Sequence, residues 1–284
     1  MSATVAVIAM GEMGAGVAAR LVEGGATVLT SLQGRSADSA GRAAAAGVRP
    51  VGDDRELVER ADILLSIVPP ARAREMSERL LPELRRAASP PLFVDCNAIA
   101  PQTLAEIVAP FLDAGLPFAD AGIIGGPPVT GGYTPRIYVS GAAASSVVRL
   151  NEHGLDVRPI SAGLGDASAL KMAYAGCTKG TQAVMISIML GAARAGVTGP
   201  LVAEMADSLP GRIDAQVRNL PSVLRKAYRW DGEMEEIARF LAPETGGARI
   251  FEGSAELYRR LAEDAAAGPE AERMALLALF GKAP

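Results

Sequence analysis

The sequence predicts an α/β fold, with a Rossmann-type doubly wound sheet followed by an all-α C-terminal domain and a long helix linking the two. Short apolar runs alternate with helix-like segments up to about residue 160, and no convincing strand pattern follows. A glycine-rich turn separates the first apolar run from the first helix-like segment. A chain of 284 residues has room for two domains, which we place at residues 1–162 and 163–284.

The N-terminal strands are expected to form a largely parallel sheet. The early apolar runs are continuous rather than alternating, which is typical of strands buried on both faces. The expected strands are Thr4–Ala9, Ala26–Ser31, Ile63–Val68, Leu92–Asp95, Phe118–Ile123, Arg136–Ser140 and Leu155–Ile160. The expected helices between them are Met13–Glu23, Ser36–Ala46, Asp54–Arg60, Pro70–Arg86, Pro101–Ala114 and Ala142–Glu152.

The C-terminal part is expected to be entirely helical. The stretch from Asp166 to about Ala195 is predicted to be a single helix that contains Gly176, Gly180 and Gly191. Each of these glycines costs about 1 kcal/mol relative to alanine in a helix interior, so we expect close packing on them. Further helices are expected at Pro200–Ser208, Arg212–Leu224, Gly232–Leu241, Ser254–Ala266 and Pro269–Phe280.

Composition excludes several classes of protein. The formal net charge of −4 argues against a dedicated nucleic-acid binder, which normally carries a basic face. The most apolar stretch, Ala183–Ala193, is too short to cross a bilayer, and no export signal is visible. Two scattered cysteines and the single histidine, His153, support neither a disulfide framework nor a metal site. We therefore expect a cytoplasmic protein with a small-molecule substrate and no nucleic-acid, membrane or metal partner.

The turn after the first strand is the candidate dinucleotide site. It reads Met10, Gly11, Glu12, Met13 and Gly14, and Ala9 takes the first glycine position of the GxGxxG pattern. Glycines let backbone N–H groups approach a pyrophosphate, and the helix that follows adds partial positive charge. The alternative is a simple tight turn. We favour nucleotide binding because the turn lies between an apolar strand and a helix.

The end of the second strand favours NADP over NAD. An NAD enzyme usually carries an acidic residue there for the ribose 2′-hydroxyl, but the segment 29–33 contains none. Arg35 and Ser36 follow instead, and a guanidinium binds a 2′-phosphate in a forked geometry. The alternative is a solvated Arg35 beside a Ser36 that only caps the next helix.

Two more strand ends are expected to line the same crevice, because ligands of open α/β sheets bind beyond the carboxyl ends of strands. Val68 and Pro69 follow one strand and are expected to contact the cofactor. Asn97 follows the next and is expected to hydrogen-bond the nicotinamide ribose or the substrate, with a turn-forming role as the alternative. Cys96 is interpreted as a buried small residue rather than a nucleophile.

Four motifs in order resemble those of the β-hydroxyacid dehydrogenase superfamily, which includes 3-hydroxyisobutyrate and 6-phosphogluconate dehydrogenases. They are the glycine-rich turn at 11–14, the segment at 95–101, the segment at 120–126 and the segment at 165–171. The resemblance covers about the first 195 residues. The remainder looks like a phosphogluconate-dehydrogenase-like branch with its own C-terminal domain.

The resemblance implies that Lys171 is the general acid/base. An unperturbed lysine has a pKa near 10.4, so service as a base near neutrality requires a lower value in a desolvated cleft. The alternative is a lysine whose stem packs on the helix while its ammonium stays in solvent. The family places an asparagine four residues later, where this chain has Ala175. Tyr174 and Thr178 lie near the same helix face as Lys171 and are the candidates to replace it, with Lys179 a weaker one.

The resemblance also implies that Ile124, Gly125 and Gly126 bind the substrate's carboxylate or hydroxyl through backbone N–H groups. Ile124 stands where the family usually has serine, so one hydroxyl donor is missing and the pocket is more apolar.

These expectations predict an NADP-dependent oxidoreductase that moves a hydride between nicotinamide and a small hydroxy acid or its keto form. The family also implies a homodimer. Two alternatives stay open, an NADPH-dependent imine reductase and a non-catalytic NADP-binding protein. The missing asparagine and the apolar loop keep the first of them open.

Overall fold

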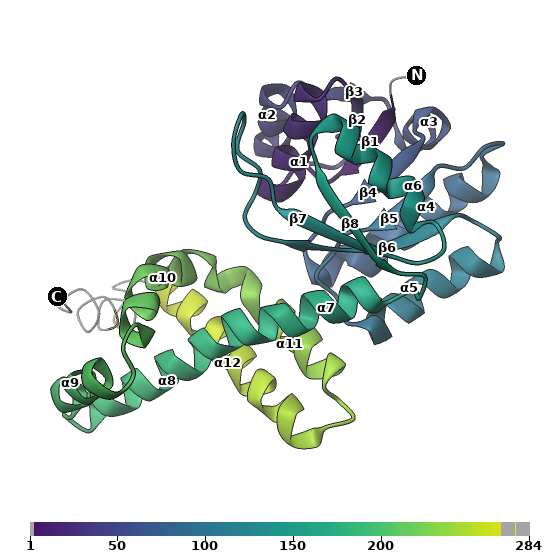
Figure 1. Cartoon of the computed structure of the whole chain (residues 1–284). Coiled ribbons are helices and arrows are strands. Elements are labelled where there is room, and N and C mark those ends of the chain that lie inside the picture. Colours follow the sequence, from purple (N-terminus) through teal and green to yellow (C-terminus); the bar gives the residue numbers. More distant parts are fainter. Residues whose placement is uncertain (1–2, 268–275, 277–284) are drawn as a thin grey trace. The chain divides into compact units, whose positions relative to one another are not determined.

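A computed structural model describes residues 3–267 and Leu276 (Figure 1). The chain divides into two compact units, Met1–Met172 and Ala173–Pro284, and each is described by itself. The expected last helix, Pro269–Phe280, lies outside the described residues except for Leu276.

The first unit is built on one eight-stranded sheet in the order β3-β2-β1-β4-β5-β6-β7-β8. Strands β1 to β6 are parallel, β7 runs antiparallel to β6, and β8 runs parallel to β7. The strands are β1 (Thr4–Ile8), β2 (Thr27–Ser31), β3 (Arg49–Val51), β4 (Ile63–Ser66), β5 (Leu92–Asp95), β6 (Phe118–Ile124), β7 (Arg136–Ser140) and β8 (Asp156–Ser161). This confirms the predicted doubly wound α/β class.

Helices cover both faces of the sheet, so each face has its own apolar core. One face packs against α1 (Glu12–Glu23), α2 (Ala37–Ala45), α6 (Ala144–Val148) and the short η2 (Arg149–His153). The other packs against α3 (Asp54–Arg60), α4 (Ala73–Arg86) and α5 (Pro101–Asp113), with η1 (Pro70–Arg72) leading into α4. Burial on both faces explains the continuously apolar strands.

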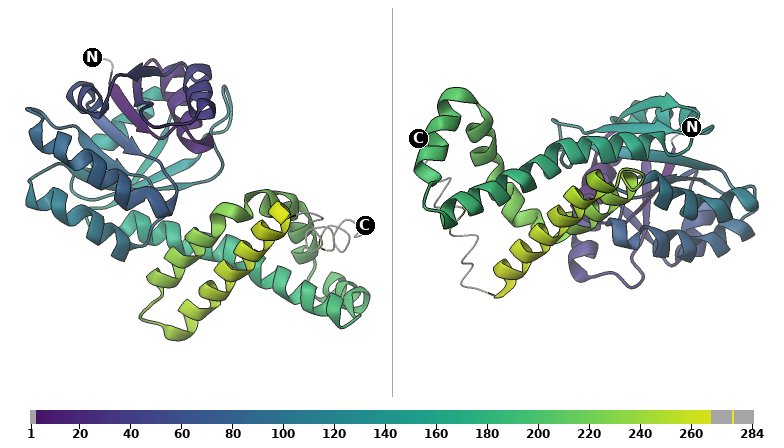
Figure 2. Two further views of the ribbon diagram at one scale, coloured as in Figure 1. Left: turned by 180° about the vertical axis from the view of Figure 1, so that it is seen from behind. Right: turned by 90° about the horizontal axis from the view of Figure 1, so that it is seen from below.

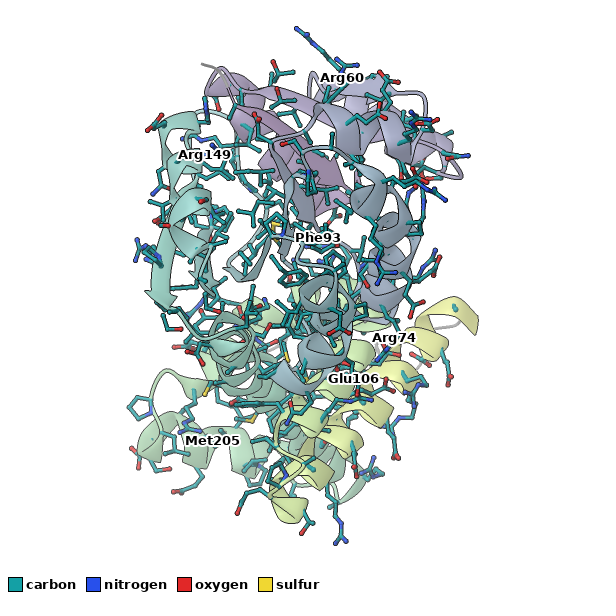
Figure 3. All side chains as sticks on the ribbon, turned by 90° about the vertical axis from the view of Figure 1, so that its right-hand side faces the viewer. Arg60, Arg74, Phe93, Glu106, Arg149 and Met205 are labelled. Carbon is teal, nitrogen blue, oxygen red and sulfur yellow. The ribbon has the colours of Figure 1, made fainter. Side chains whose placement is uncertain are left out.

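Aromatic packing anchors the second of these cores. Phe93, Phe111 and Phe118 have ring centroids 4.9 to 5.4 Å apart. In Figure 3, Phe93 lies in the interior, whereas Arg74 of α4 and Glu106 of α5 form an ion pair at the surface. Buried rings at such separations contribute about 0.5–1.5 kcal/mol per pair beyond the area they bury.

The second unit is helical throughout its described part. Its helices are α8 (Thr181–Arg194), α9 (Thr198–Ser208), α10 (Arg212–Lys226), η4 (Ala227–Arg229), α11 (Trp230–Phe240) and α12 (Thr245–Ala267). Helix α12, yellow in Figure 2, packs along α11. The rings of Trp230 and Tyr258 meet edge to face at 5.4 Å within this pair of helices.

The expected 30-residue helix is present but changes its winding in the middle. It consists of α7 (Asp166–Ala175), a π-helical segment η3 (Gly176–Gly180) and α8. The ring of Phe251 fills the space beside Gly176 and Gly180, where added Cβ atoms would lie 3.2 and 2.4 Å from it. The predicted close packing is therefore observed at Gly176 and Gly180, within the second unit. It is not observed at Gly191, where the nearest atom to an added Cβ would be Nη2 of Arg194, at 3.9 Å.

The remaining differences from the predicted elements have local causes. Strand β3 was not expected because it is short and contains Pro50, which an edge strand tolerates. Helix α12 begins at Thr245 rather than at the predicted Ser254, because two glycines in its first turn weaken the helical pattern. The predicted helix Ala142–Glu152 is divided into α6 and η2. No helix in the described ranges is long and apolar enough to cross a membrane.

The packing of α1 on β1 generates a stability prediction. A Cβ at Gly14 would lie 1.9 Å from the backbone oxygen of Ala9, whereas a Cβ at Gly11 would meet nothing within 4 Å. Gly14→Ala should therefore lower the free energy of unfolding by about 2 kcal/mol or more, since backbone atoms must move. Gly11→Ala, the matched control, should cost less than about 1 kcal/mol. Urea unfolding measures both, and equal losses would contradict the assigned contact.

Candidate functional site

The candidate site lies at one edge of the sheet in the first unit. Strands β1, β4, β5 and β6 are neighbours and run parallel, so their carboxyl ends meet at this edge. The chain passes from β1 outward to β2 and β3, then returns to β4 on the other side of β1. Such a reversal of strand order opens the crevice in which α/β proteins bind nucleotides.

The glycine-rich turn has the features that a pyrophosphate requires. Gly11 is the N-cap of α1, and no side chain caps the start of this helix. The space at the Cα of Gly11 is open, whereas Gly14 lets α1 approach β1 closely. Arg42 of α2 donates from Nε to the carbonyl oxygen of Met10 at 2.7 Å and so ties the turn in place. Of the predicted contacts, Met10 is buried, Glu12 is exposed and Met13 packs on the core.

Arg35 lies between β2 and α2 with much of its hydrogen-bonding capacity unused. Its Nη2 contacts only the sulfur of Met76, at 3.9 Å, and its buried Nε has no partner in the described chain. Burial lowers the pKa of Arg35, and the nearby Arg79 and Arg72 guanidinium groups lower it further. Arg35 is therefore a cation whose environment favours an anionic ligand.

The two neighbouring arginines are already paired, which distinguishes them from Arg35. Arg79 binds both oxygens of Asp54 at 2.5 and 2.8 Å, and Arg72 pairs with Glu75 at 2.6 Å. Ser36 is the N-cap of α2 and accepts from the backbone N–H of Ser39 at 3.3 Å. The capping role foreseen as the alternative for Ser36 is thus present.

The loop after β6 lies against the start of α1. Pro127 and Pro128 contact Gly16, where a Cβ would lie 2.9 Å from the ring of Pro128. Gly125 has φ +131°, a conformation that disfavours other residues, and the hydroxyl of Tyr133 packs against it. The predicted cofactor turn and the predicted substrate loop are therefore adjacent. Ile124, the last residue of β6, is buried, and the space beside Gly126 is open.

Lys171 is fixed by β6. Its ammonium donates to the carbonyl oxygen of Ile123 at 2.8 Å, and its side chain is half-buried. Gly122 lies beneath it, since a Cβ there would be 3.0 Å from the Cβ of Lys171 and 2.8 Å from the backbone oxygen of Ala167. The predicted acid/base residue thus sits beside the predicted substrate loop at the carboxyl end of β6.

Four buried polar residues lie side by side on the neighbouring strands β4, β5, β6 and β7. Strand register aligns Ser66 with Asp95, Asp95 with Asp120, and Asp120 with Ser140. We call these four residues the polar row, and none of them is accessible to solvent. Burial raises the pKa of Asp120, while burial and the nearby Asp120 raise the pKa of Asp95 to about 7. This row escapes detection in the sequence, because each member lies on a different strand.

Asn97 joins two of the strand ends. Its side-chain nitrogen donates to Asp95 at 2.9 Å and to Ser66 at 3.2 Å, and its oxygen accepts from the backbone N–H of Val68 at 2.7 Å. Asn97 therefore holds the β4 and β5 loops together, with Pro69 exposed beside them. Direct contact between Asn97 and a ligand stays a prediction.

The other candidates lie in the second unit. Tyr174 is 49% exposed. The hydroxyl of Thr178 donates to the backbone carbonyl oxygen of Tyr174 at 2.9 Å. Lys179 forms an ion pair with Glu233, and its ammonium lies 5.1 Å from the ring centroid of Trp230. Thr178 and Lys179 thus have partners of their own in the helical unit.

Other chemistry finds little support in the described part of the chain. No group of three or more metal-ligating side chains occurs there. His153 contacts the carbonyl oxygen of Gly24 at 2.8 Å, which ties η2 to the end of α1. Burial raises the pKa of the Cys96 thiol well above its usual value, so this residue is poorly suited to act as a nucleophile.

The raised pKa of Asp95 predicts a pH-dependent stability. The folded state binds a proton that the unfolded chain releases near pH 4, so stability should fall as pH rises from about 4 to 7. This carboxyl should contribute a slope of about 1.4 kcal/mol per pH unit in that window. Asp95→Asn should reduce the slope, whereas the exposed-site control Asp113→Asn should not. Urea unfolding at several pH values measures this, and an unchanged slope in Asp95→Asn would contradict it.

Comparison with protein families and solved structures gives results for both units. Residues 4–147 match the model of the NAD binding domain of 6-phosphogluconate dehydrogenase. Residues 192–261 match the model of a domain of unknown function, DUF1932.

One similar solved structure is a conserved protein of unknown function, described as structurally similar to 3-hydroxyacid dehydrogenases. It is 29% identical to this chain with a TM-score of 0.66, and the match covers 91% of this chain and 99% of that one. The 3-hydroxyisobutyrate dehydrogenase of Mycobacterium tuberculosis is 22% identical with a TM-score of 0.73, covering 97% and 99%. An imine reductase from Myxococcus stipitatus in complex with NADP+ is 21% identical with a TM-score of 0.55, covering 99% and 100%. A variant of that reductase has been solved with NAD+. The last three likenesses establish the fold alone.

Three findings agree on a dinucleotide-binding fold. They are the open glycine turn, the reversal of strand order beside it and the family match of residues 4–147. The chain belongs to the family defined by the NAD binding domain of 6-phosphogluconate dehydrogenase, within the β-hydroxyacid dehydrogenase superfamily that its motifs resemble.

Proposed function

We propose that the protein is an NADP-dependent oxidoreductase that moves a hydride between nicotinamide and a small hydroxy acid or its keto form. Lys171 acts as its general acid/base. The observation that carries this proposal is the placement of the Lys171 ammonium, 2.8 Å from the carbonyl oxygen of Ile123. That point lies at the same sheet edge as the open glycine turn and beside the loop of Gly125 and Gly126.

The residues of the first unit fit a dinucleotide. The uncapped start of α1 and the open space at Gly11 suit the pyrophosphate, and the loops that carry Val68, Pro69 and Asn97 border the same crevice. When bound, the cofactor supplies or accepts the hydride. The chain's own contribution is to bind and orient the reactants and to handle the proton.

Arg35 supports the choice of NADP. A phosphate on the ribose would give the free guanidinium nitrogens of Arg35 an ionised partner, which the described chain does not provide. The pairing of Arg79 with Asp54 and of Arg72 with Glu75 leaves Arg35 as the available cation. Ser36 adds a hydroxyl at the start of α2.

Lys171 supports the proton-transfer step. In the reducing direction its ammonium protonates the substrate oxygen, and in the oxidising direction its amine takes that proton back. The carbonyl oxygen of Ile123 holds the lysine nitrogen beside the loop of Gly125 and Gly126, whose backbone N–H groups we assign to a carboxylate or hydroxyl of the substrate. On this proposal, residues 1–162 bind the cofactor and residues 163–284, with Tyr174 and Thr178, contribute to the substrate site.

Imine reduction is the second candidate. Ala175 and Ile124 remove two polar groups that the superfamily uses, so the site offers fewer hydrogen bonds to a hydroxy acid. The same sheet edge and the same lysine would serve a C=N bond, with the proton passing to nitrogen. Likeness in fold to imine reductases also favours this candidate.

We also propose a cytoplasmic homodimer. Tyr174, Val184 and Ile188 are about half exposed along the long helix of the second unit, a pattern suited to a partner chain. A monomer at micromolar concentration in gel filtration would count against this proposal.

Arg35→Ala tests the cofactor choice. Loss of a charge-assisted hydrogen bond should raise the Michaelis constant for NADPH about 10- to 100-fold and leave that for NADH nearly unchanged. Arg55→Ala, which removes an exposed arginine paired with Glu59, is the matched control and should change neither. Equal losses for both coenzymes in Arg35→Ala would remove the argument for NADP.

Lys171→Met tests the chemistry. Turnover should fall by a factor of about 100 or more, whereas the NADPH dissociation constant should change less than about twofold. Lys226→Met is the matched control and should retain activity. The assay follows NADPH absorbance with 3-hydroxy acids, their keto forms and cyclic imines. Turnover restricted to the imines would favour the second candidate, and tight NADPH binding without turnover would favour a non-catalytic protein.

A further inference from the structure

We infer that Asp120 is a positioning residue, which fixes where α7 begins on β6 and thereby where the ammonium of Lys171 lies. This inference rests on the proposed role of Lys171. Asp120 itself is buried at the centre of the polar row, and the donors to its carboxylate come from β7 and from the start of α7.

Four hydrogen bonds converge on the Asp120 carboxylate. Oδ2 accepts from the backbone N–H groups of Gly165 and Ser168 at 3.1 and 2.9 Å and from the hydroxyl of Ser140 at 3.0 Å. Oδ1 accepts from the hydroxyl of Ser168 at 2.6 Å. The Ser140 hydroxyl also accepts from the backbone N–H of Ala167 at 3.0 Å. A buried carboxylate on one strand thus caps a helix that begins 46 residues later.

The capped residues are linked to Lys171 by helix geometry. Residues three and four apart lie on one face, so Ser168 and Ala167 share a face with Lys171. Along β6, side chains two apart also share a face, so Gly122 follows Asp120 toward the carboxyl end. Asp120 holds the first turn of α7, and Gly122 lies beneath the next turn at the Lys171 Cβ. The register of α7 on β6 then carries the lysine nitrogen to the oxygen of Ile123.

The alternative is that these hydrogen bonds only stabilise the fold. The two roles differ in what they predict for Lys171 in variants that remain folded. Loss of a purely structural bond lowers the unfolding free energy without changing the surroundings of the lysine. Loss of a positioning bond also changes the exposure and the reactivity of the lysine amine. The reactivity of the Lys171 amine can be measured separately, because the sequence contains few lysines. They are Lys171, Lys179, Lys226 and Lys282, and only Lys171 lies in the first unit.

The experiment measures amine acylation of the intact protein at a fixed pH, with each lysine followed by mass spectrometry, together with kcat and the Michaelis constants. Ser168→Ala removes one hydrogen bond and keeps the buried carboxylate. Asp120→Asn replaces an acceptor by a donor facing the N–H groups of α7. Gly122→Ala displaces α7 from the lysine side. Ser77→Ala is the matched control, because the buried hydroxyl of Ser77 donates to the backbone oxygen of Arg74 within the same helix, α4.

We expect the acylation rate of Lys171 to change about three- to tenfold in Ser168→Ala and in Gly122→Ala, while Lys226 stays constant. In both variants kcat should fall by a similar factor, and the Michaelis constant for NADPH should change less than twofold. Ser77→Ala should change neither quantity. Gly122→Ala keeps the inference testable if Asp120→Asn fails to fold.

An unchanged acylation rate of Lys171 in folded Ser168→Ala and Gly122→Ala would overturn the inference. Altered acylation with undiminished kcat would leave the positioning role standing and would instead contradict the proposed role of Lys171. Labelling needs no turnover, so it remains decisive for Asp120 even if no substrate is found.

Discussion

The arrangement of the first unit depends on placing one charged carboxylate, Asp120, where water does not reach. Burying such a group without partners is costly, and four hydrogen bonds offset this cost. Two of these bonds come from backbone N–H groups at the start of α7, which have no partner inside the helix. The carboxylate and the helix start therefore satisfy each other, and the helix dipole strengthens the contact.

This pairing distinguishes the N-terminus of α7, which binds the carboxylate of Asp120, from the N-terminus of α1 in the same unit, which has no side-chain cap. The start of α7 is occupied by the chain's own carboxylate, which takes the place of an external anion. The start of α1 has no side-chain cap and has open space at Gly11. The two helix starts therefore serve different purposes, one fixing the chain and the other available to a ligand.

Periodicity and turn chemistry in the sequence were sufficient to predict the class of fold, the helical second unit and the position of the glycine turn. Strand β3 could not be predicted, because it is short and contains Pro50, a residue that is depleted in strands. The polar row was missed for a different reason, since its members become neighbours only through strand register. The role of Ser168 could not be predicted either, because a serine early in a helix is usually a helix cap. Its bond to Asp120 on β6 is apparent only in the structure.

A buried carboxylate also provides something that apolar packing would not. Ala167, on the face of α7 toward the sheet, has only a methyl side chain, and so small a side chain does little to select among registers along a strand. Hydrogen bonds from Gly165 and Ser168 to a single acceptor are satisfied in only one of them. Sliding the helix would leave the Asp120 charge unpaired in a dry interior, at a cost of several kcal/mol. The position of Lys171 is then determined by electrostatics as well as by the fit of its neighbours.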